Sequence, residues 1–389
     1  MTKTNVPRLR FREFNGEWKD EKFKSLVERV KMTSDSDQYK KIEFSNIDEG
    51  KLINKLSIND TKGIAFRKND ILFGKLRPYL KNWYYSMFDG VAVGDFWVFR
   101  AKSQISSSMF IYYLIQTHRY TRISNYTTGT KMPRSDWNFV SNSSFYISNL
   151  EEQQKIGSFF AKIDKLIELQ TKKLKQLKKL KQGYLQKMFP QDGESVPRLR
   201  FSGFSEEWKV SKGKAIFYNF SDKNHEDLPP LSVTQDQKIW YRDELDPALS
   251  YDKQKLSTYK LIDKNDVVIG LRSFVGGFAI SDKRGIVSPA YTILKFRNTP
   301  WDFYFTRNLF TSYVFIQSLK KITYGIRVNG RSISYNDFST LPLVYTDNLE
   351  EQKKIGSLLN TVDSLIELQE KKLDNIKKMK KAYLQKMFI

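Results

Sequence analysis

The chain has 389 residues, and its 66 lysines and arginines against 43 acidic residues give a formal net charge of +23. This length suggests two or three domains, and 40% hydrophobic residues suffice for their cores, so the charge predicts a polyanionic partner rather than disorder. The absence of cysteine excludes disulfides, thiol nucleophiles and thiolate zinc sites, and it is consistent with a cytoplasmic protein.

The beginning of the chain carries a motif that returns in its second half. Residues 1–7 lack the apolar stretch of a signal peptide, and no later run is long enough to span a membrane, so we expect neither secretion nor membrane insertion. Adhesion to anionic lipid is an alternative use of the charge, but we expect no membrane partner because the charge is spread over the chain and does not form one basic amphipathic helix. Residues 6–11 read Val-Pro-Arg-Leu-Arg-Phe and recur at 196–201, followed in both copies by a matched Phe, Glu and Trp. The repeat indicates an internal duplication.

The segments after each copy of this motif are predicted to mix strands and helices. Both contain Lys-Asn-Asp before an apolar run that ends in glycine, at 68–74 and 264–270. Apolar runs predict strands at 70–73, 91–93, 96–99 and 267–269, and buried helices at 109–115 and 301–309. We therefore expect two mixed α/β modules that share a plan but differ in detail.

Each module is followed by a predicted long helix, at 151–188 and at 350–387. The segments that contain them, 149–189 and 348–388, share 27 of 41 residues, lack proline and keep apolar residues at heptad spacing. The predicted fold class is mixed α+β, with two α/β modules joined by two long antiparallel coiled-coil helices in a pseudo-two-fold internal repeat.

Polar residues interrupt the heptad seams at equivalent places in both helices. Gln170 and Gln369 each lie near the middle of a helix, so their amides would meet in an antiparallel pair and set its register. Lys181 and Lys380 form a second matched pair. The alternative is that each helix covers only the core of its own half, with the glutamine facing solvent. In the antiparallel arrangement, helices roughly 55 Å long could hold the modules a fixed distance apart.

Loops rich in glycine and basic residues are the predicted DNA contacts. Glycine lets a backbone approach a phosphate, arginine and lysine read guanine, and serine, asparagine and tyrosine contact phosphates or other base edges. The candidates are Lys75, Arg77, Tyr79, Lys131, Arg134, Ser135, Arg272, Ser273, Arg327, Asn329, Arg331 and Ser332. For any single arginine, a solvated charge or an intramolecular ion pair is an equally good interpretation.

The sequence offers no catalytic or metal site. It contains neither a phosphate-binding Gly-x-x-x-x-Gly-Lys-Ser/Thr loop nor a Gly-x-Gly-x-x-Gly dinucleotide motif. The two histidines, His118 and His225, have no neighbouring His or Glu at the spacing of metal ligands. We therefore expect no catalytic residues and no bound metal in this chain.

The whole chain resembles the DNA-specificity (S) subunit of type I restriction-modification systems, in a staphylococcus-like form. The resemblance rests on the openings at 6–18 and 196–208 and on the Asn-Leu-Glu-Glu-Gln-x-Lys-Ile-Gly starts of the long helices. The Tyr-Leu-Gln-Lys-Met-Phe helix ends and the Gly-Lys-Leu-Arg-Pro-Tyr run at 74–79 complete it. The run at 270–274 departs from the pattern because it lacks this lysine and proline, which weakens a transfer of contacts to the second half.

The resemblance implies a division of the chain and a role for each part. Its four segments are a first target-recognition domain with an N-terminal conserved segment at 1–148, a central conserved spacer helix at 149–189, a second target-recognition domain at 190–347, and a C-terminal conserved spacer helix at 348–389. Such a subunit is non-catalytic, recognises a bipartite, asymmetric double-stranded DNA target, and uses the helices as a spacer.

The resemblance also implies partners. Two modification (M) subunits would bind the conserved regions and supply S-adenosylmethionine and adenine methylation, and restriction (R) subunits would add ATP- and Mg-dependent translocation and cleavage. No cofactor is expected in this chain itself. A competing hypothesis is a non-catalytic architectural protein that binds DNA without sequence choice, which equal affinity for all duplexes would favour. A standalone enzyme is a third hypothesis, and it would require catalysis by the isolated chain.

Overall fold

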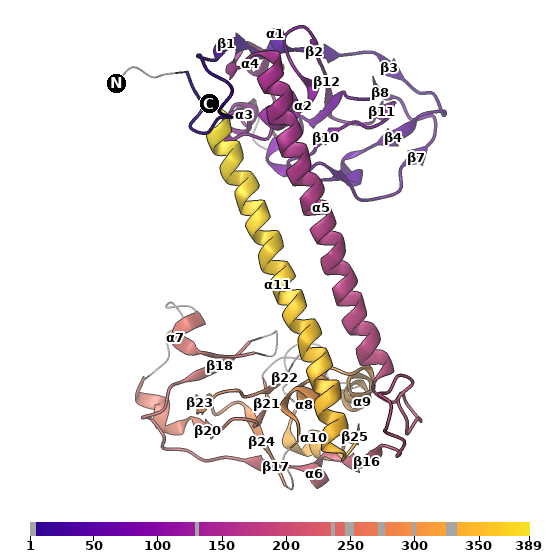
Figure 1. The fold of residues 1–389 in the computed structure, drawn as a ribbon, viewed down its shortest axis with the longest axis vertical. Helices are drawn as coiled ribbons and strands as arrows, with labels where there is room; N and C mark the ends of the chain where they lie inside the picture. Colours follow the sequence, from indigo (N-terminus) through magenta and orange to yellow (C-terminus); the bar gives the residue numbers. More distant parts are fainter. Residues whose placement is uncertain are drawn as a thin grey trace. The chain divides into compact units, whose positions relative to one another are not determined.

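The computed structural model describes residues 5–128, 132–234, 238–245, 253–270, 277–297, 301–323 and 333–389. The chain forms two compact units, each composed of segments that are far apart in the sequence (Figure 1). The first unit contains residues 1–172 and 371–389, and the second contains residues 173–370. Each unit therefore combines one mixed module with parts of both long helices.

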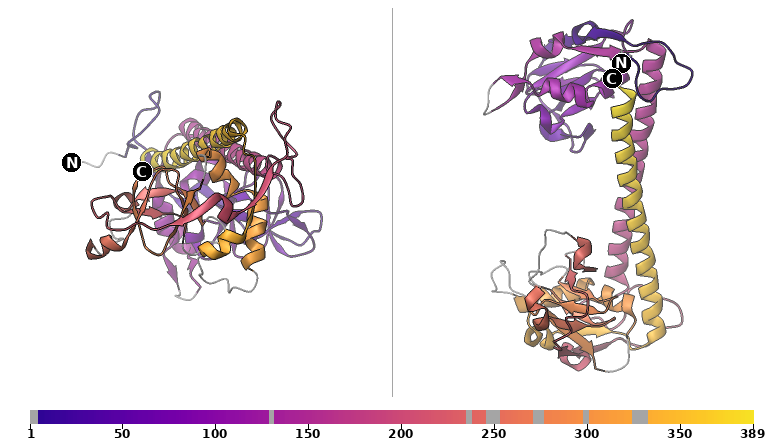
Figure 2. Two further views of the ribbon diagram at one scale, coloured as in Figure 1. Left: turned by 90° about the horizontal axis from the view of Figure 1, so that it is seen from below. Right: turned by 90° about the vertical axis from the view of Figure 1, so that its left-hand side faces the viewer.

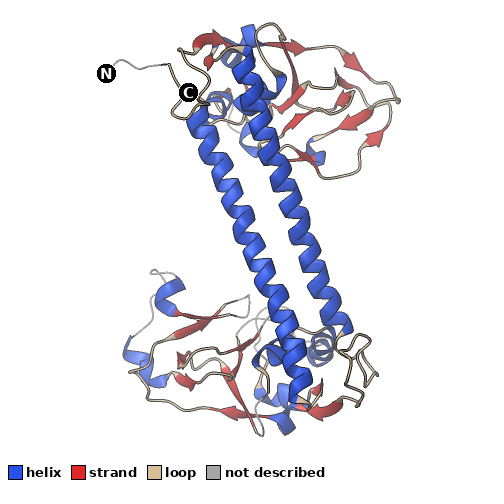
Figure 3. Ribbon diagram, in the orientation of Figure 1, coloured by secondary structure: helices blue, strands red, loops and turns tan. Residues whose placement is uncertain are grey.

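In the part that the structure describes, the module of the first unit consists of short strands and short helices (Figure 3). Its strands are β1 (Lys19–Lys22), β2 (Val27–Val30), β3 (Thr33–Ser34), β4 (Lys40–Ile42), β5 (Ile47–Asp48), β6 (Lys51–Leu52), β7 (Ser57–Ile58), β8 (Gly63–Phe66), β9 (Ile71–Gly74), β10 (Trp83–Tyr85), β11 (Gly90–Ala92), β12 (Phe96–Ala101), β13 (Thr127–Thr128), β14 (Arg134–Ser135) and β15 (Ser144–Ile147). Its helices are α1 (Phe23–Leu26), α2 (Ser108–Leu114), α3 (His118–Ser124) and α4 (Trp137–Asn142), with 3-10 turns η1 (Phe44–Asn46) and η2 (Pro78–Leu80).

Two sheets organise this module. One has the strand order β10-β9-β12-β2, and the other has the order β3-β8-β11-β4-β7. All of their pairings are antiparallel except that between β11 and β4. Every residue of β9 is buried, and so are the first four residues of β12, which explains why both strands read as continuous apolar runs.

The second unit repeats this plan, with fewer strands in the part of it that the structure describes. Its strands are β16 (Lys209–Lys212), β17 (Phe217–Phe220), β18 (Leu231–Val233), β19 (Ile239–Tyr241), β20 (Lys260–Ile262), β21 (Val267–Ile269), β22 (Phe278–Ile280), β23 (Gly285–Val287), β24 (Thr292–Phe296) and β25 (Pro342–Tyr345). Its helices are α6 (Gly213–Ile216), α7 (Arg242–Leu245), α8 (Phe303–Leu309), α9 (Tyr313–Thr323) and α10 (Tyr335–Thr340), with the 3-10 turn η3 (Lys253–Thr258). The order β22-β21-β24-β17 matches β10-β9-β12-β2, so the duplication extends to sheet topology.

The two long helices are α5 (Leu150–Lys187) and α11 (Leu349–Met387). Their bounds confirm the predicted helices to within one residue at each end. The strands and short helices predicted from apolar runs are also found, displaced by at most two residues at either end. Local periodicity was sufficient for these elements because each buries a face or a whole run of apolar side chains.

Within each unit, α5 and α11 run antiparallel and lie side by side (Figure 2). In the first unit, Phe159 packs against Tyr383 and Asp164 pairs with Lys380 at 2.7 Å. In the second unit, Lys181 pairs with Asp363 at 2.6 Å. The lysines that interrupt the seams therefore each meet an aspartate of the opposite helix, which compensates their charge at a partly buried position.

The glutamines of the seam lie in different units. Gln369 is buried and Gln170 is half-buried, so neither fully faces solvent. Gln170 belongs to the first unit and Gln369 to the second. Their role in setting the register of the two helices stays a prediction.

Each copy of the opening motif is bonded to the long helices of its own unit by an ion pair and by a backbone hydrogen bond. Arg10 donates two hydrogen bonds of 2.8 Å to Glu152, and Arg200 makes the same pair with Glu351 at 2.7 and 2.9 Å. The amide of Leu9 donates to the carbonyl of Lys386 at the end of α11, as that of Leu199 does to Lys187 at the end of α5.

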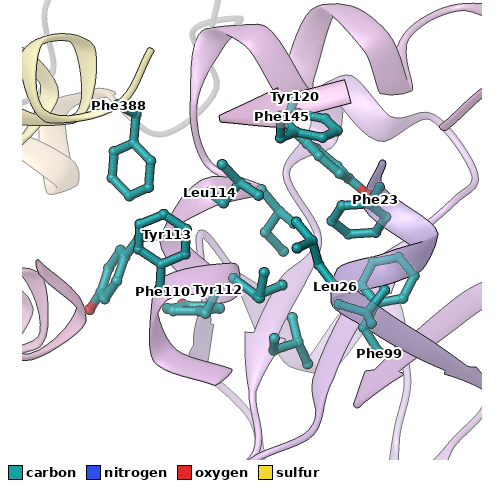
Figure 4. Packing of buried hydrophobic residues seen from close by; sticks show 14 of the residues in the cluster. Phe23, Leu26, Phe99, Phe110, Tyr112, Tyr113, Leu114, Tyr120, Phe145 and Phe388 are labelled. Carbon is teal, nitrogen blue, oxygen red and sulfur yellow. The ribbon is translucent and has the colours of Figure 1, made fainter. Parts of the chain in front are cut away.

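The apolar end of each long helix completes a core. Phe388, just after α11, packs with its ring centroid 5.1 Å from that of Phe110 (Figure 4). The centroid of the Trp18 ring lies 6.5 Å from that of Phe388. Phe189, just after α5, packs in the same way against Trp208 and Phe305. The repeated Met-Phe pairs are therefore core residues of the two modules.

Candidate nucleic-acid interface

The Lys-Asn-Asp motif anchors the hairpin that carries the first candidate loop. Asn69 adopts a left-handed conformation, with φ of 72°, and turns the chain into β9. The buried carboxylate of Asp70 then accepts hydrogen bonds from the Arg67 amide at 2.8 Å and from the Arg100 guanidinium at 2.9 and 2.7 Å. The motif is therefore a structural support for the loop between β9 and β10.

The same support is built in the second unit with a different cation. Asn265 has φ of 70°, and the carboxylate of Asp266 pairs with Lys295 at 2.8 Å. Burial acts to lower the pKa of Lys295, but its hydrogen bonds to Asp266 and Asp263 outweigh burial and raise it. The faint sequence similarity between the two modules thus corresponds to one shared hairpin anchor.

The loop between β9 and β10 has a constrained backbone. Gly74 is required at its start, because a Cβ atom there would lie 2.8 Å from Cβ of Asn82 and 2.9 Å from the Phe44 ring. Arg77 and Lys81 both adopt left-handed conformations, with φ of 48° and 59°, on either side of η2. Such conformations are costly for residues with a side chain and are concentrated at functional sites.

The fold brings the two candidate loops of the first module together. The amide of Arg77 donates to the carbonyl of Pro133 at 2.8 Å, and the amide of Ser135 donates to the carbonyl of Lys75 at 2.9 Å. Leu76 and Arg134 form an isolated antiparallel bridge between these bonds. Two loops whose paired residues are 56 to 60 positions apart in the chain therefore form one continuous surface.

Asp95 joins the basic side chains of this surface. Its carboxylate lies 3.4 Å from Nζ of Lys75, and it accepts hydrogen bonds of 3.2 and 2.9 Å from Nε and Nη2 of Arg134. Partial burial acts to raise the pKa of Asp95, but the hydrogen bonds and charges of Arg134 and Lys75 outweigh it and place the pKa below its usual value. Asp95 is therefore a stable anion under these two cations.

Three of the candidates present polar side chains to solvent on this surface. Arg77 and Tyr79 are exposed, and the structure gives the Arg77 guanidinium no hydrogen bond or ion pair with any residue that it describes. Arg134 keeps about half of its side chain exposed, at 51%, despite its bonds to Asp95. Lys75 is half-buried beside them.

Ser135 differs from the prediction of a DNA contact. Its side chain is buried, and its hydroxyl donates a hydrogen bond of 2.7 Å to the carbonyl of Ser124. A buried hydroxyl engaged with the backbone has no free face for a macromolecule, so Ser135 instead ties this loop to the end of α3. The remaining candidates lie outside the described residues; they are Lys131, Arg272, Ser273, Arg327, Asn329, Arg331 and Ser332.

Asp95 is the residue of this site that the sequence did not reveal. It directly precedes the predicted strand that became β12, where an acidic residue has no distinctive spacing. Its partners are 20 and 39 positions away in the chain, so only the pairing of the loops brings them together. The residue before Asp95 is Gly94, and its φ of 98° shows that the chain turns there in a conformation that favours glycine.

The second unit contains a cavity of about 310 Å³ between β19, the β22–β23 turn, α8 and α11. Its carboxylates are engaged, since Glu367 pairs with Lys238, Asp363 with Lys181, and Asp282 with Lys283. Across the residues that the structure describes, no group of three or more His, Cys, Asp or Glu side chains could hold a metal ion. No described helix is long and apolar enough to cross a membrane.

Comparison with known proteins identifies relatives in sequence. The chain is 25% identical over 307 residues to the type I restriction enzyme MjaVIII specificity subunit of Methanocaldococcus jannaschii. The aligned region covers 73% of this chain and 70% of that protein. It is 25% identical over 250 residues to the putative type I restriction enzyme MjaX specificity subunit of the same organism, with 60% of this chain and 56% of that protein covered.

Solved structures are similar in fold. The S subunit of a type I restriction-modification system from M. genitalium superposes with a TM-score of 0.65 at 14% identity, over 99% of both chains. A chain from a study of complex assembly and conformational transition of the type I R-M system superposes with a TM-score of 0.53 at 19% identity, over 95% of this chain and 97% of that one.

The family itself is identified by a match to most of the sequence. The type I restriction modification DNA specificity domain matches twice, at residues 15–179 and 206–378. Each match begins within the opening segment, runs through one module and continues far into the long helix that follows it. The chain therefore belongs to the type I restriction modification DNA specificity domain family and carries two copies of the domain.

Proposed function

We propose that this chain is the sequence-specific DNA-binding subunit of a type I restriction-modification complex, and that each module recognises one half of a bipartite, asymmetric target. Membership of the DNA specificity domain family and the duplicated architecture support this function. At the level of residues, the proposal rests on the surface formed by the paired loops at 74–79 and 133–135, which we call the joined loop surface. Arg77, Arg134 and Tyr79 are exposed together on it.

This surface has the chemistry needed to read DNA. Lysines and arginines attract phosphates in a salt-dependent way, and an arginine with a free guanidinium edge reads guanine in the major groove through two hydrogen bonds. Arg134 has such an edge, because only its Nε and Nη2 atoms bond to Asp95. The proposal therefore separates affinity, which comes from the net charge, from specificity, which comes from a few loop side chains.

The chain itself is proposed to be non-catalytic, in the cytoplasm, within a larger complex. In this proposal M subunits bind S-adenosylmethionine and methylate adenine, and R subunits use ATP and Mg for translocation and cleavage. The carboxylates of the cavity in the second unit are paired with lysines, so they do not resemble a general acid and base.

Exposed apolar residues on the long helices support two docking sites for M subunits. Leu166, Leu169 and Met379 are exposed in the first unit, and their counterparts Leu365, Leu368 and Leu180 are exposed in the second. We call these sets the first and second apolar stripes. Leu166 and Met379 each directly precede a seam residue, and in an antiparallel pair such positions flank the seam on the same side. Exposed apolar patches that recur in both copies favour protein partners, one for each unit.

The test of this function is adenine methylation in cells. Cells that carry this chain with a matching M subunit are compared with cells that carry M alone, by sequencing methylated bases across the genome. A new bipartite motif with a gap of fixed length supports the proposal and provides the target sequence. A stable M–S complex that methylates no new motif contradicts it.

A further inference from the structure

Asp95 occupies a fixed position at the base of the joined loop surface. It lies between β11 and β12, and it is followed at once by the fully buried Phe96. The carbonyl of Asp95 also accepts the amide of Lys75 at 2.9 Å, so both its backbone and its side chain hold the first loop. Its position is therefore set by the sheet and is independent of the exposed side chains that it contacts.

The contact between Asp95 and Arg134 leaves one edge of the guanidinium available. A guanidinium is planar and presents two donor edges, one made by Nε and Nη2 and the other by Nη1 and Nη2. The first edge bonds to a single oxygen of Asp95, at 3.2 and 2.9 Å. The second edge makes no hydrogen bond with any residue that the structure describes, and the side chain is about half exposed.

We propose that Asp95 is a positioning residue that aims Arg134, and with it Lys75, at base edges in the first half of the DNA target. This inference rests on the proposed function and goes beyond it, because it assigns the accuracy of readout to a residue that does not itself touch DNA. Both oxygens of Asp95 are engaged by the two cations, so the carboxylate supports the donors and does not accept from a base.

Asp95 has a second effect on specificity through its charge. A carboxylate beneath the joined loop surface repels phosphates, so it lowers the affinity for DNA of any sequence. The same carboxylate orients Arg134 for the target sequence. Replacement by a neutral residue should therefore weaken discrimination without weakening binding in general. A substitution that merely damaged the fold would reduce both together.

The experiment uses the full-length chain in complex with an M subunit. Binding is measured for the target duplex and for duplexes with one base changed in either half. For Asp95→Asn we expect a tenfold or greater loss of discrimination at one or two bases of the first half, no change in the second half, and equal or tighter binding to unrelated DNA. Asp95→Glu, which keeps the charge, should recover part of the discrimination.

The matched control is Glu194→Gln. Glu194 accepts the same two donor atoms from an arginine, Nε and Nη2 of Arg198, at 2.9 and 2.7 Å, but it lies in the second unit, before the first strand of that module at Lys209. Glu194→Gln therefore removes the same charge and the same kind of ion pair as Asp95→Asn does. Discrimination between target and altered duplexes should stay at the wild-type value. An equal loss in the control and in Asp95→Asn would overturn the inference.

A double-mutant cycle tests whether Asp95 acts through Arg134. In an Arg134→Ala background, Asp95→Asn should cause little further loss of discrimination, because the side chain that it orients is absent. A full additional loss, or a wild-type ratio in Asp95→Asn alone, overturns the positioning role. If the wild-type complex itself shows no sequence preference, the proposed function fails, whereas a selective wild type with an insensitive Asp95 rejects only this inference.

Discussion

The exposed arginines of the first module are the residues from which we expect specificity. Arg77→Ala or Arg134→Ala should relax recognition of the first half-site only, at a cost of about 1–3 kcal/mol if the contact to the base has two hydrogen bonds. The methylated motif in cells reports this directly, because bases that are no longer read become degenerate. Unchanged motifs in both variants would reject the assignment of these arginines.

The pKa of Asp95 predicts how this recognition depends on pH. Since the pKa lies below its usual value, Asp95 stays ionised above about pH 4, and its ion pairs are lost only as the pH falls through the lowered value. Discrimination in the first half-site should therefore be constant between about pH 6 and pH 9. Duplex competition assays across this range measure it, and a loss of discrimination near neutral pH would show that another group controls the arginine.

The ion pairs of Arg10 with Glu152 and of Arg200 with Glu351 should be essential to stability, because both carboxylates are buried. Arg10→Ala leaves Glu152 without its cation, and Arg200→Ala does the same to Glu351, so each should destabilise its own unit by about 3–5 kcal/mol. Chemical denaturation monitored separately in the two units measures the loss. Arg8→Ala, at an exposed position of the same motif, is the control, and an equal effect there would contradict the prediction.

Residue types alone could not distinguish the residues proposed to contact DNA from the residues that hold the loops in place. The sequence identified Lys75, Arg77 and Arg134 as basic residues in loops that contain glycine, and these three lie together on one surface. It also included Ser135, whose burial depends on a hydrogen bond to Ser124, and it missed Asp95, whose importance depends on partners far away in the chain. Contacts of this kind follow from strand pairing, which local composition does not specify.

At the scale of elements, the long helices were the most predictable part of the chain. A heptad pattern without proline determines a helix over its whole length, and the pattern also indicated which residues face the partner helix. The two apolar stripes were not predicted, because a leucine next to the seam in sequence can be buried by a module or left exposed. Only the three-dimensional arrangement distinguishes these outcomes.

The apolar stripes predict the number of bound M subunits. Leu169→Glu should remove one M subunit and Leu368→Glu the other, since the loss of a buried leucine costs about 1.5–3 kcal/mol and reduces affinity at least about tenfold. Mass spectrometry of the intact complex should show two, one and zero copies for the wild type, the single variants and the double variant.

The control for this experiment is Lys175→Glu, a change at an exposed position of α5 that is not three or four residues from any leucine of the stripes. It introduces the same acidic residue on the same helix without touching either stripe. Two bound copies in both single leucine variants would place the docking surface elsewhere.

At the scale of the whole molecule, the helices are proposed to set the gap between the half-sites. Insertion of seven residues after Gln170 and after Gln369 keeps the heptad pattern and lengthens each helix by about 10 Å, which corresponds to roughly three base pairs. The methylated motif should keep both halves and gain a longer gap. An altered half-site with an unchanged gap would argue against the spacer role.

The composition of the first unit has a consequence for how the protein is made. Its core contains Met387 and Phe388, which the ribosome adds only after all of residues 173–370. The first module therefore emerges with an apolar surface around Phe110 and Trp18 that stays uncovered while the entire second unit is synthesised. During that interval the uncovered apolar surface favours aggregation of the nascent chain, although the first module is the first to leave the ribosome.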